Sequence, residues 1–171
     1  MTNARLFRHL INLWPCIRGT GVRATHISDD YREIDLELPL NWRTRNRVGT
    51  IFGGSIYAST DPFYMIMLME ILGKDFVVWD KGATLKFKRP GTRTLFMKLR
   101  LAKEFTDGVR TRALAEGELT FELPVSYRDE DGVECAEVTK VLYVATKEFY
   151  RAKVARRDQA EKAKNSPESA R

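Results

Sequence analysis

Residues 46–61 bring together groups that could do chemistry: an amide at Asn46, a glycine pair at Gly53 and Gly54, and a carboxylate at Asp61. The glycines let the backbone turn sharply and leave room for a ligand to approach. Backbone N–H groups at the start of a helix point outwards, where the helix dipole favours negative charge. A carboxylate in an otherwise apolar segment is costly unless it is hydrogen-bonded or solvated. Together these groups indicate a site for a ligand that carries or develops negative charge.

The element that must position these groups is an apolar helix over residues 63–72, which contains one ionisable side chain, Glu70. A helix that is apolar on every face is expected to be buried on all sides. The segment is shorter than a membrane span, which needs about 18 or more apolar residues. Pro62 should kink or restart the helix, because proline cannot donate a backbone hydrogen bond. Asp61, directly before Pro62, could also be an N-cap, and this role is compatible with a chemical one.

Alternating apolar residues predict an antiparallel sheet around this helix, preceded by an amphipathic helix over residues 3–14 that stops at Pro15. Sequential strands joined by short turns pair antiparallel, and an apolar helix needs a curved sheet to enclose it. The expected fold class is therefore α+β, with about six strands wrapped around one long central helix. The strands are expected over residues 20–28, 33–40, 76–88 with an interruption at 80–82, 95–101, 113–127 and 133–146.

The composition is that of one ordinary domain, with 171 residues of which 43% are hydrophobic. The net charge is +6, but residues 151–171 hold seven Lys or Arg against three Asp or Glu, which leaves about +2 for the rest of the chain. No basic stripe with interleaved aromatic residues is found, so nucleic-acid binding is not expected. We expect one domain over residues 1–150 and a charged tail over residues 151–171 that is helical first and disordered beyond.

Metal binding and export are not expected either. Cys16 and Cys135 lie far apart and the chain has two histidines, so no ligand cluster is indicated. Residues 1–17 lack the features of a secretory signal, and no membrane span is found, which favours a cytoplasmic protein. Arg45 and Arg47, just before the helix entrance, could hold phosphate groups, and surface solubility explains them equally well.

The spacing from Asn46 to Gly53 and on to Asp61, followed by a long apolar helix, resembles the signature of hotdog-fold acyl-CoA thioesterases of the PaaI-like branch. The chain is most similar to an uncharacterised branch of that superfamily, and it has Phe52 where the family usually has histidine. The resemblance covers roughly residues 20 to 147. It implies a homodimer or a dimer of dimers with sites between subunits and no cofactor apart from CoA in the substrate.

The same resemblance implies roles for individual residues. Asn46 and Gly53 would hold the thioester, and Asp61 would be the general base or nucleophile. A polar residue on the strand after the helix reaches the site across the dimer interface in the family. Asp80 matches this position, with Lys81 and Thr84 as neighbours that a small misalignment would substitute.

Two functions follow. The first is hydrolysis of an acyl-CoA or acyl-carrier thioester, in which the Gly53 N–H stabilises the oxyanion and a base at Asp61 has a pKa raised by its apolar setting. The second is a non-catalytic acyl-CoA or fatty-acyl binding protein that uses the same cavity. Phe52 in place of histidine and the possible capping role of Asp61 favour the second function. Gly54 and Phe52 would line the substrate site in both.

Overall fold

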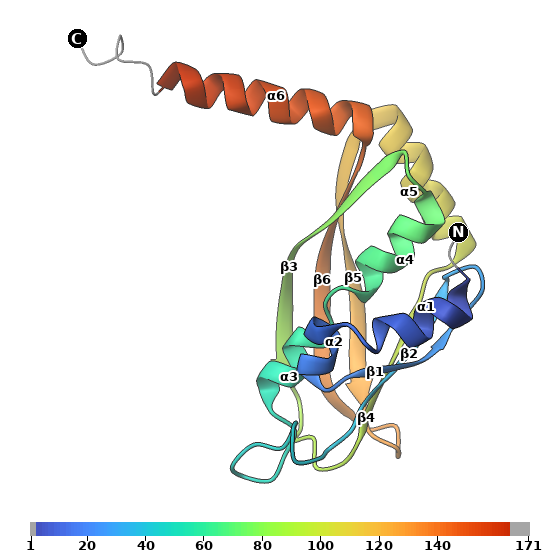
Figure 1. Ribbon diagram of the computed structural model, residues 1–171, viewed down its shortest axis with the longest axis vertical. Coiled ribbons are helices and arrows are strands. Elements are labelled where there is room, and N and C mark those ends of the chain that lie inside the picture. Colours follow the sequence, from blue (N-terminus) through green and yellow to red (C-terminus); the bar gives the residue numbers. More distant parts are fainter. Residues whose placement is uncertain (1–2, 165–171) are drawn as a thin grey trace.

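The computed structural model describes residues 3–164 (Figure 1). Its strands form one antiparallel sheet of six strands in the order β1-β2-β4-β5-β6-β3. The order and pairing confirm the expected α+β fold class. In chain order the elements are α1 (Ala4–Ile11), α2 (Pro15–Thr20), β1 (Arg23–Ile27), β2 (Glu33–Leu38), α3 (Gly53–Ala58), α4 (Phe63–Leu72), β3 (Phe76–Phe87), β4 (Leu95–Arg100), α5 (Lys103–Glu116), β5 (Glu118–Arg128), β6 (Glu134–Thr146) and α6 (Lys147–Lys164).

The core lies between one face of the sheet and helix α4. Because side chains alternate between the faces of a strand, every second residue of β2 and β4 points to this core. Within the core, Leu36 of β2 lies opposite Met97 of β4 in the ladder. Phe63, Met67 and Leu68 of α4 are fully buried in the same core cluster. The apolar helix is therefore the centre of the fold, as its sequence predicts.

The central helix differs from the expectation in two respects. It is divided into α3 and α4 by residues 59–62, and α4 restarts at Phe63 with Pro62 as its N-cap residue. Asp61 makes no capping hydrogen bond, so the capping role considered for it is wrong. Helix α4 is also not buried on all sides, because Met69 is 50% exposed. The break is fixed by a buried hydrogen bond of 2.7 Å between the hydroxyl groups of Ser59 and Tyr127.

Helix α5 corrects the strand expected over residues 113–127, since residues 113–116 form the last turn of this helix. Phe105, Val109 and Ala113 lie at four-residue intervals and face the sheet, which is a helical pattern. The helix ends at Gly117, whose φ of 84° is in the left-handed region that glycine tolerates. Strand β5 then begins at Glu118, and its alternation follows the prediction.

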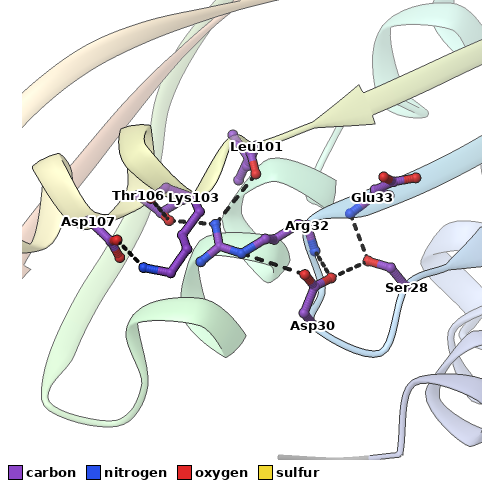
Figure 2. Close-up of polar contacts among 8 residues, drawn as sticks. All are labelled: Ser28, Asp30, Arg32, Glu33, Leu101, Lys103, Thr106 and Asp107. Carbon is purple, nitrogen blue, oxygen red and sulfur yellow. Dashed lines mark hydrogen bonds and ion pairs between the residues drawn. The ribbon is translucent and has the colours of Figure 1, made fainter.

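Figure 2 shows how the start of α5 is tied to the β1–β2 hairpin. The Arg32 guanidinium donates hydrogen bonds to Thr106 Oγ1 at 2.6 Å and to the Leu101 carbonyl at 3.5 Å. Asp30 pairs with Arg32 at 3.6 Å and accepts a hydrogen bond from Ser28 at 2.7 Å. The Ser28 hydrogen bond, followed by Arg32, lowers the pKa of Asp30. This network joins two segments that are far apart in the sequence.

The N-terminal helix ends at Ile11, and Pro15 begins α2 instead of stopping a helix over residues 3–14. Proline is favoured at the first position of a helix because its missing N–H has no helical partner there. The side chain of Asn12 exchanges hydrogen bonds of 2.8 and 2.9 Å with the backbone of Ala24 on β1. Arg8 donates to the Thr25 carbonyl at 2.8 Å. The outer edge of β1 is thereby covered.

Strand β3 forms the other edge of the sheet and carries no such cover from another strand of the described chain. Its ladder with β6 shifts register between Asp80 and Gly82, so Lys81 is an extra residue. Before this bulge the even-numbered residues of β3 face the core, and after it the odd-numbered ones do, as shown by their partners on β6. The interruption expected at residues 80–82 is this bulge, which leaves the strand continuous.

Helix α6 extends away from the body of the protein (Figure 1). Only its first turns contact the sheet, where the ring of Phe149 covers Gly117. The expected disordered end of the tail, residues 165–171, lies outside the described residues. Between residues 3 and 164 no helix is long and apolar enough to cross a membrane.

Candidate active site

The predicted site residues line two separate hollows within one protomer. The first has a volume of about 530 Å³ and contains Asp61, Asp80, Lys81 and Lys140 among its lining residues. The second has a volume of about 400 Å³ and is lined by Asn46, Gly53 and Phe87, among others. The carboxylate and the glycine entrance, predicted to act together, therefore do not share one hollow in a single chain.

Lys140 is the centre of the first hollow. Its ammonium group lies 3.3 Å from Asp61 Oδ1 and 3.2 Å from Asp80 Oδ2, and its side chain is 4% exposed. An ammonium group buried to this degree is costly unless it is paired. The two carboxylates, one from the α3–α4 break and one from the bulge of β3, supply that pairing. The site therefore brings three distant parts of the chain together.

Sequence reasoning missed Lys140, although a signal was present. Strand β6 places Ala136, Val138, Leu142 and Val144 on the core face, all fully buried. Lys140 stands at the position between Val138 and Leu142 in this alternation. A lysine at a core-facing position is unusual enough to mark a functional candidate.

Asp80 is the buried carboxyl group of the hollow, with a side chain that is 16% exposed. Burial is the main cause that raises its pKa to about 6, and the neighbouring Asp61 adds to the rise while Lys140 opposes it. Neither Asp80 oxygen has a hydrogen bond of good geometry within residues 3–164, so the contact with Lys140 is chiefly ionic. Asp80 is therefore expected to change its charge near pH 6.

Replacing Asp80 with Asn should change how stability depends on pH. Because the folded state binds the Asp80 proton more tightly, the stability from this group is present below pH 3.8 and is lost as the pH rises through about 6. We expect the wild type to lose about 1–2 kcal/mol relative to Asp80→Asn between pH 4 and pH 8, less than the full pKa shift implies because Lys140 remains nearby. Urea unfolding at a series of pH values measures this difference.

The exposed Asp75→Asn exchange is the matched control and should not alter the pH dependence. Parallel stability curves for wild type and Asp80→Asn would contradict the assignment of the raised pKa to Asp80.

Asp61 is the exposed member of the same cluster, with a side chain that is 60% exposed. The apolar setting expected for Asp61 is thus not found, because the break between α3 and α4 places its carboxylate at the mouth of the hollow. The buried carboxyl group is Asp80 instead. Asp61 is available to a ligand, whereas Lys140 and Asp80 lie behind it.

The second hollow is shaped by the loop before α3. The side-chain oxygen Oδ1 of Asn46 accepts hydrogen bonds from the backbone N–H groups of Val48 at 3.1 Å and Thr50 at 3.0 Å, and its Nδ2 donates to Thr50 Oγ1 at 2.8 Å. Asn46 therefore closes this loop in the protomer, and its proposed contact with a ligand would use the second hydrogen of Nδ2. The loop in turn holds the entrance of α3 in place.

Aromatic rings stand over both glycines. A Cβ atom at Gly53 would lie 2.8 Å from the Phe87 ring, and one at Gly54 would lie 2.2 Å from the Phe52 ring. Phe52 and Phe87 are 57% and 60% exposed, so neither ring is held firmly by packing. The first-turn N–H groups of α3 have no partner within the helix, as at any helix start.

The remaining predicted residues are distributed around these hollows. Arg45 and Arg47 are exposed in the loop before α3, and Lys88 and Arg89 line the second hollow. Lys81, the bulge residue, lines the first hollow and lies over the Tyr143 ring at 5.1 Å. Thr84 is exposed and pairs with Thr139 on the opposite face of β3 from Asp80, so the structure does not bring it to either hollow.

Within the described part of the chain, no group of three or more His, Cys, Asp or Glu side chains could hold a metal ion.

A central helix enclosed by an antiparallel sheet of this strand order defines a hotdog fold, and solved structures share it. A protein from Pseudomonas aeruginosa, described as of unknown function and a probable thioesterase, has a TM-score of 0.74 at 22% identity, covering 83% of this chain and 95% of that one. A protein of unknown function from Chlorobaculum tepidum has a TM-score of 0.67 at 11% identity, covering 84% and 94%. A thioesterase from Haemophilus influenzae has a TM-score of 0.61 at 13% identity, covering 85% and 92%.

Residues 3–144 match the family described as Domain of unknown function (DUF4442), and the chain belongs to this family. No curated protein matches the chain. At these identities the likeness to solved structures shows the fold, which confirms the predicted hotdog architecture.

Proposed function

We propose that this protein hydrolyses an acyl thioester, with Asp61 as the catalytic carboxylate. The observation that carries the proposal is an exposed aspartate at the mouth of a hollow, held by a buried ammonium group. The names of two structural neighbours, a probable thioesterase and a thioesterase, support the same reaction class. The fold alone would not support this reaction class, because one fold can carry many functions.

The reaction needs a base and an oxyanion donor. Asp61 takes a proton from water as the water oxygen bonds to the thioester carbonyl carbon, or attacks that carbon itself. The Gly53 N–H at the start of α3 donates a hydrogen bond to the carbonyl oxygen as negative charge develops there. When Asp61 acts as the base, the C–S bond then breaks and the proton held by Asp61 passes to the departing sulfur. When Asp61 attacks directly, the C–S bond breaks to give an acyl–Asp61 anhydride and a thiolate that takes a proton from solvent, and water then hydrolyses the anhydride to restore the Asp61 carboxylate. The products are a carboxylic acid and a thiol, and no cofactor takes part in this scheme.

The proposed site is completed by a second copy of the chain. Gly53 and Asp61 line separate hollows in one protomer, and β3 is an uncovered edge whereas β1 is covered by α1. An exposed edge strand is a template for pairing with another chain. Pairing of two β3 edges would bring the hollows of two protomers together in a homodimer, and two dimers could associate further.

Trp79→Lys should weaken this dimer by at least about tenfold in Kd. Trp79 lies on the β3 edge strand and is 50% exposed, and a lysine on an edge disfavours pairing. Light scattering coupled to gel filtration over a range of protein concentrations measures the change. Trp42→Lys, at a loop position that is 88% exposed, is the control and should leave the mass unchanged. A wild-type protein that is monomeric at all concentrations would contradict the proposed interface.

The thiol half of the substrate is proposed to be CoA. Lys88 and Arg89 line the second hollow, and the exposed Arg45 and Arg47 flank its lining residue Asn46 in the chain. Guanidinium groups bind phosphates in bidentate fashion. Lys88 is paired with Glu137 at 2.7 Å, which leaves the arginines as the proposed phosphate ligands. An acyl carrier protein thioester also presents a phosphate group. Comparing turnover of the acyl-CoA and the acyl carrier protein thioester of the same acyl chain distinguishes the two substrates.

The alternative is a non-catalytic acyl-CoA or fatty-acyl binding protein. The rings of Phe52 and Phe87 over Gly54 and Gly53 favour it, since they would hinder a carbonyl group from reaching the helix start unless they move. Under this alternative the same hollows bind the ligand without turnover.

Steady-state release of free thiol from acetyl-, hexanoyl-, palmitoyl- and phenylacetyl-CoA tests the proposal. Turnover of any of them that depends on Asp61 supports a thioesterase and ranks the acyl chains. Binding of these thioesters by calorimetry without turnover would instead establish the binding protein.

A further inference from the structure

We propose that Lys140 is a positioning residue of this site, an ammonium group that holds the exposed Asp61 carboxylate in place and links it to a second, buried carboxyl group at Asp80. The inference rests on the proposed function for its kinetic consequence. Its geometric part concerns three side chains that can be tested without any substrate.

The order of burial determines what each group can do. Asp61 is 60% exposed, whereas the side chains of Asp80 and Lys140 are 16% and 4% exposed. Of these three side chains, Asp61 is therefore the one open to direct contact with a ligand. Lys140 and Asp80 act through it, so they position and do not touch the reacting atoms.

The strand register explains why Lys140 can reach both carboxylates. Lys140 lies opposite Leu123 of β5 and Ala83 of β3 in the two ladders that flank it, so its stem runs between apolar neighbours on the core face. Its charged end lies between the β3 bulge, which carries Asp80, and the break that carries Asp61. An unpaired ammonium group in this surrounding would be unfavourable, so the charged end of Lys140 stays between the two carboxylates.

The charge balance of the cluster follows from this arrangement. One ammonium group faces two carboxyl groups, and burial is the main cause that raises the pKa of Asp80 to about 6. Protonation of Asp80 leaves Lys140 with Asp61 as its single ionic partner. The other titratable groups lining the hollow are Cys16 of α2, Tyr57 of α3 and Lys81 of β3.

The substrate-free test follows the Asp80 carboxyl carbon by NMR titration of aspartate-labelled protein, with the signal assigned by its absence in Asp80→Asn. We expect a midpoint near pH 6 in the wild type, a rise of at least about one unit in Lys140→Met, and a fall in Asp61→Asn. An unchanged midpoint in Lys140→Met would overturn the proposal, whatever the outcome of the activity assays. A wild type without turnover would overturn the proposed function while this titration still decides the role of Lys140.

The kinetic test compares Lys140→Met with Lys98→Met, an exchange at an exposed position of β4. Lys140→Met should lower kcat at least about tenfold, change KM less than about threefold, and move the acidic limb of the kcat profile to higher pH. Lys140→Arg should restore part of the loss. If kcat falls but the acidic limb of its pH profile stays at the same pH, Lys140 has a structural role only, and the proposal is overturned.

If Lys140→Met does not fold, the double variant Lys140→Met with Asp80→Asn removes both buried charges together and leaves Asp61 in place. A kcat that is as low as predicted for Lys140→Met supports the positioning role, and a wild-type kcat overturns it.

Discussion

Asp61→Asn should lower kcat for thioester hydrolysis by at least about 100-fold while the melting temperature stays within a few degrees of the wild type. Positioned acid–base catalysis contributes about 10²–10⁴-fold to rates, and an amide cannot accept the proton. The fold should tolerate the change because the side chain is 60% exposed and Lys140 keeps Asp80 as an ionic partner. Thiol release under saturating substrate, with circular dichroism melting of both proteins, measures the two quantities.

Asp75→Asn is the matched control, since it removes the same charge from an exposed position before β3. Single turnover in ¹⁸O-water tests for direct attack, because label in the Asp61 carboxylate shows that water opened an acyl–Asp61 anhydride at the aspartyl carbon. An Asp61→Asn protein that turns over at the wild-type rate would rule out both direct attack and the general-base role.

Gly117→Ala, which adds a single methyl group beside α6, should strongly lower the free energy of unfolding. Gly117 has a φ of 84°, and its new Cβ would lie 2.3 Å from the ring of Phe149. Positive φ at a residue other than glycine costs about 1–3 kcal/mol, and displacing the ring adds to it. We expect a loss of about 2–4 kcal/mol in the free energy of unfolding, or about 5–12 °C in melting temperature for a chain of this size.

Two controls separate the causes of this loss. Gly132→Ala has a φ of 78° but no atom within 4 Å of the new Cβ, so it should show the strain alone. Combining Gly117→Ala with Phe149→Ala should cost less than the sum of the single exchanges, because the two changes share one contact. Equal losses for Gly117→Ala and Gly132→Ala would mean that Phe149 moves aside without cost.

The fold could be predicted from the sequence wherever one periodicity was unambiguous. The apolar segment 63–72 predicts a buried helix, and the alternation of Ile34, Leu36 and Leu38 predicts a strand with one buried face. The sequence predicts a strand at residues 113–116, because Ala113, Ala115 and Gly117 continue the alternation of β5 backwards. The four-residue spacing of Phe105, Val109 and Ala113 predicts a helix for the same residues. The helix forms because α5 packs on the sheet and its Thr106 binds Arg32.

The site was harder to predict because its chemistry depends on burial. Asp61 and Asp80 line the same hollow, but the buried carboxyl group is Asp80, whereas the sequence predicts an apolar setting for Asp61. Which carboxylate is desolvated depends on the turn between α3 and α4 and on the bulge in β3, and neither shows in a local pattern. Lys140 carries the one signal that could have been used, a charge within a buried alternation. The joining of the two hollows by a second subunit stays a prediction.

The bulge at Lys81 has a consequence for comparing this chain with its relatives. Since the pleat repeats every two residues, the extra residue lets Asp80 and Leu85 face the same side although they are five positions apart. In a relative that lacks one residue between these positions, the residues matching Asp80 and Leu85 would lie on opposite faces of the strand. An alignment of β3 should therefore be anchored separately on each side of Lys81, and a single-residue gap there marks a changed site.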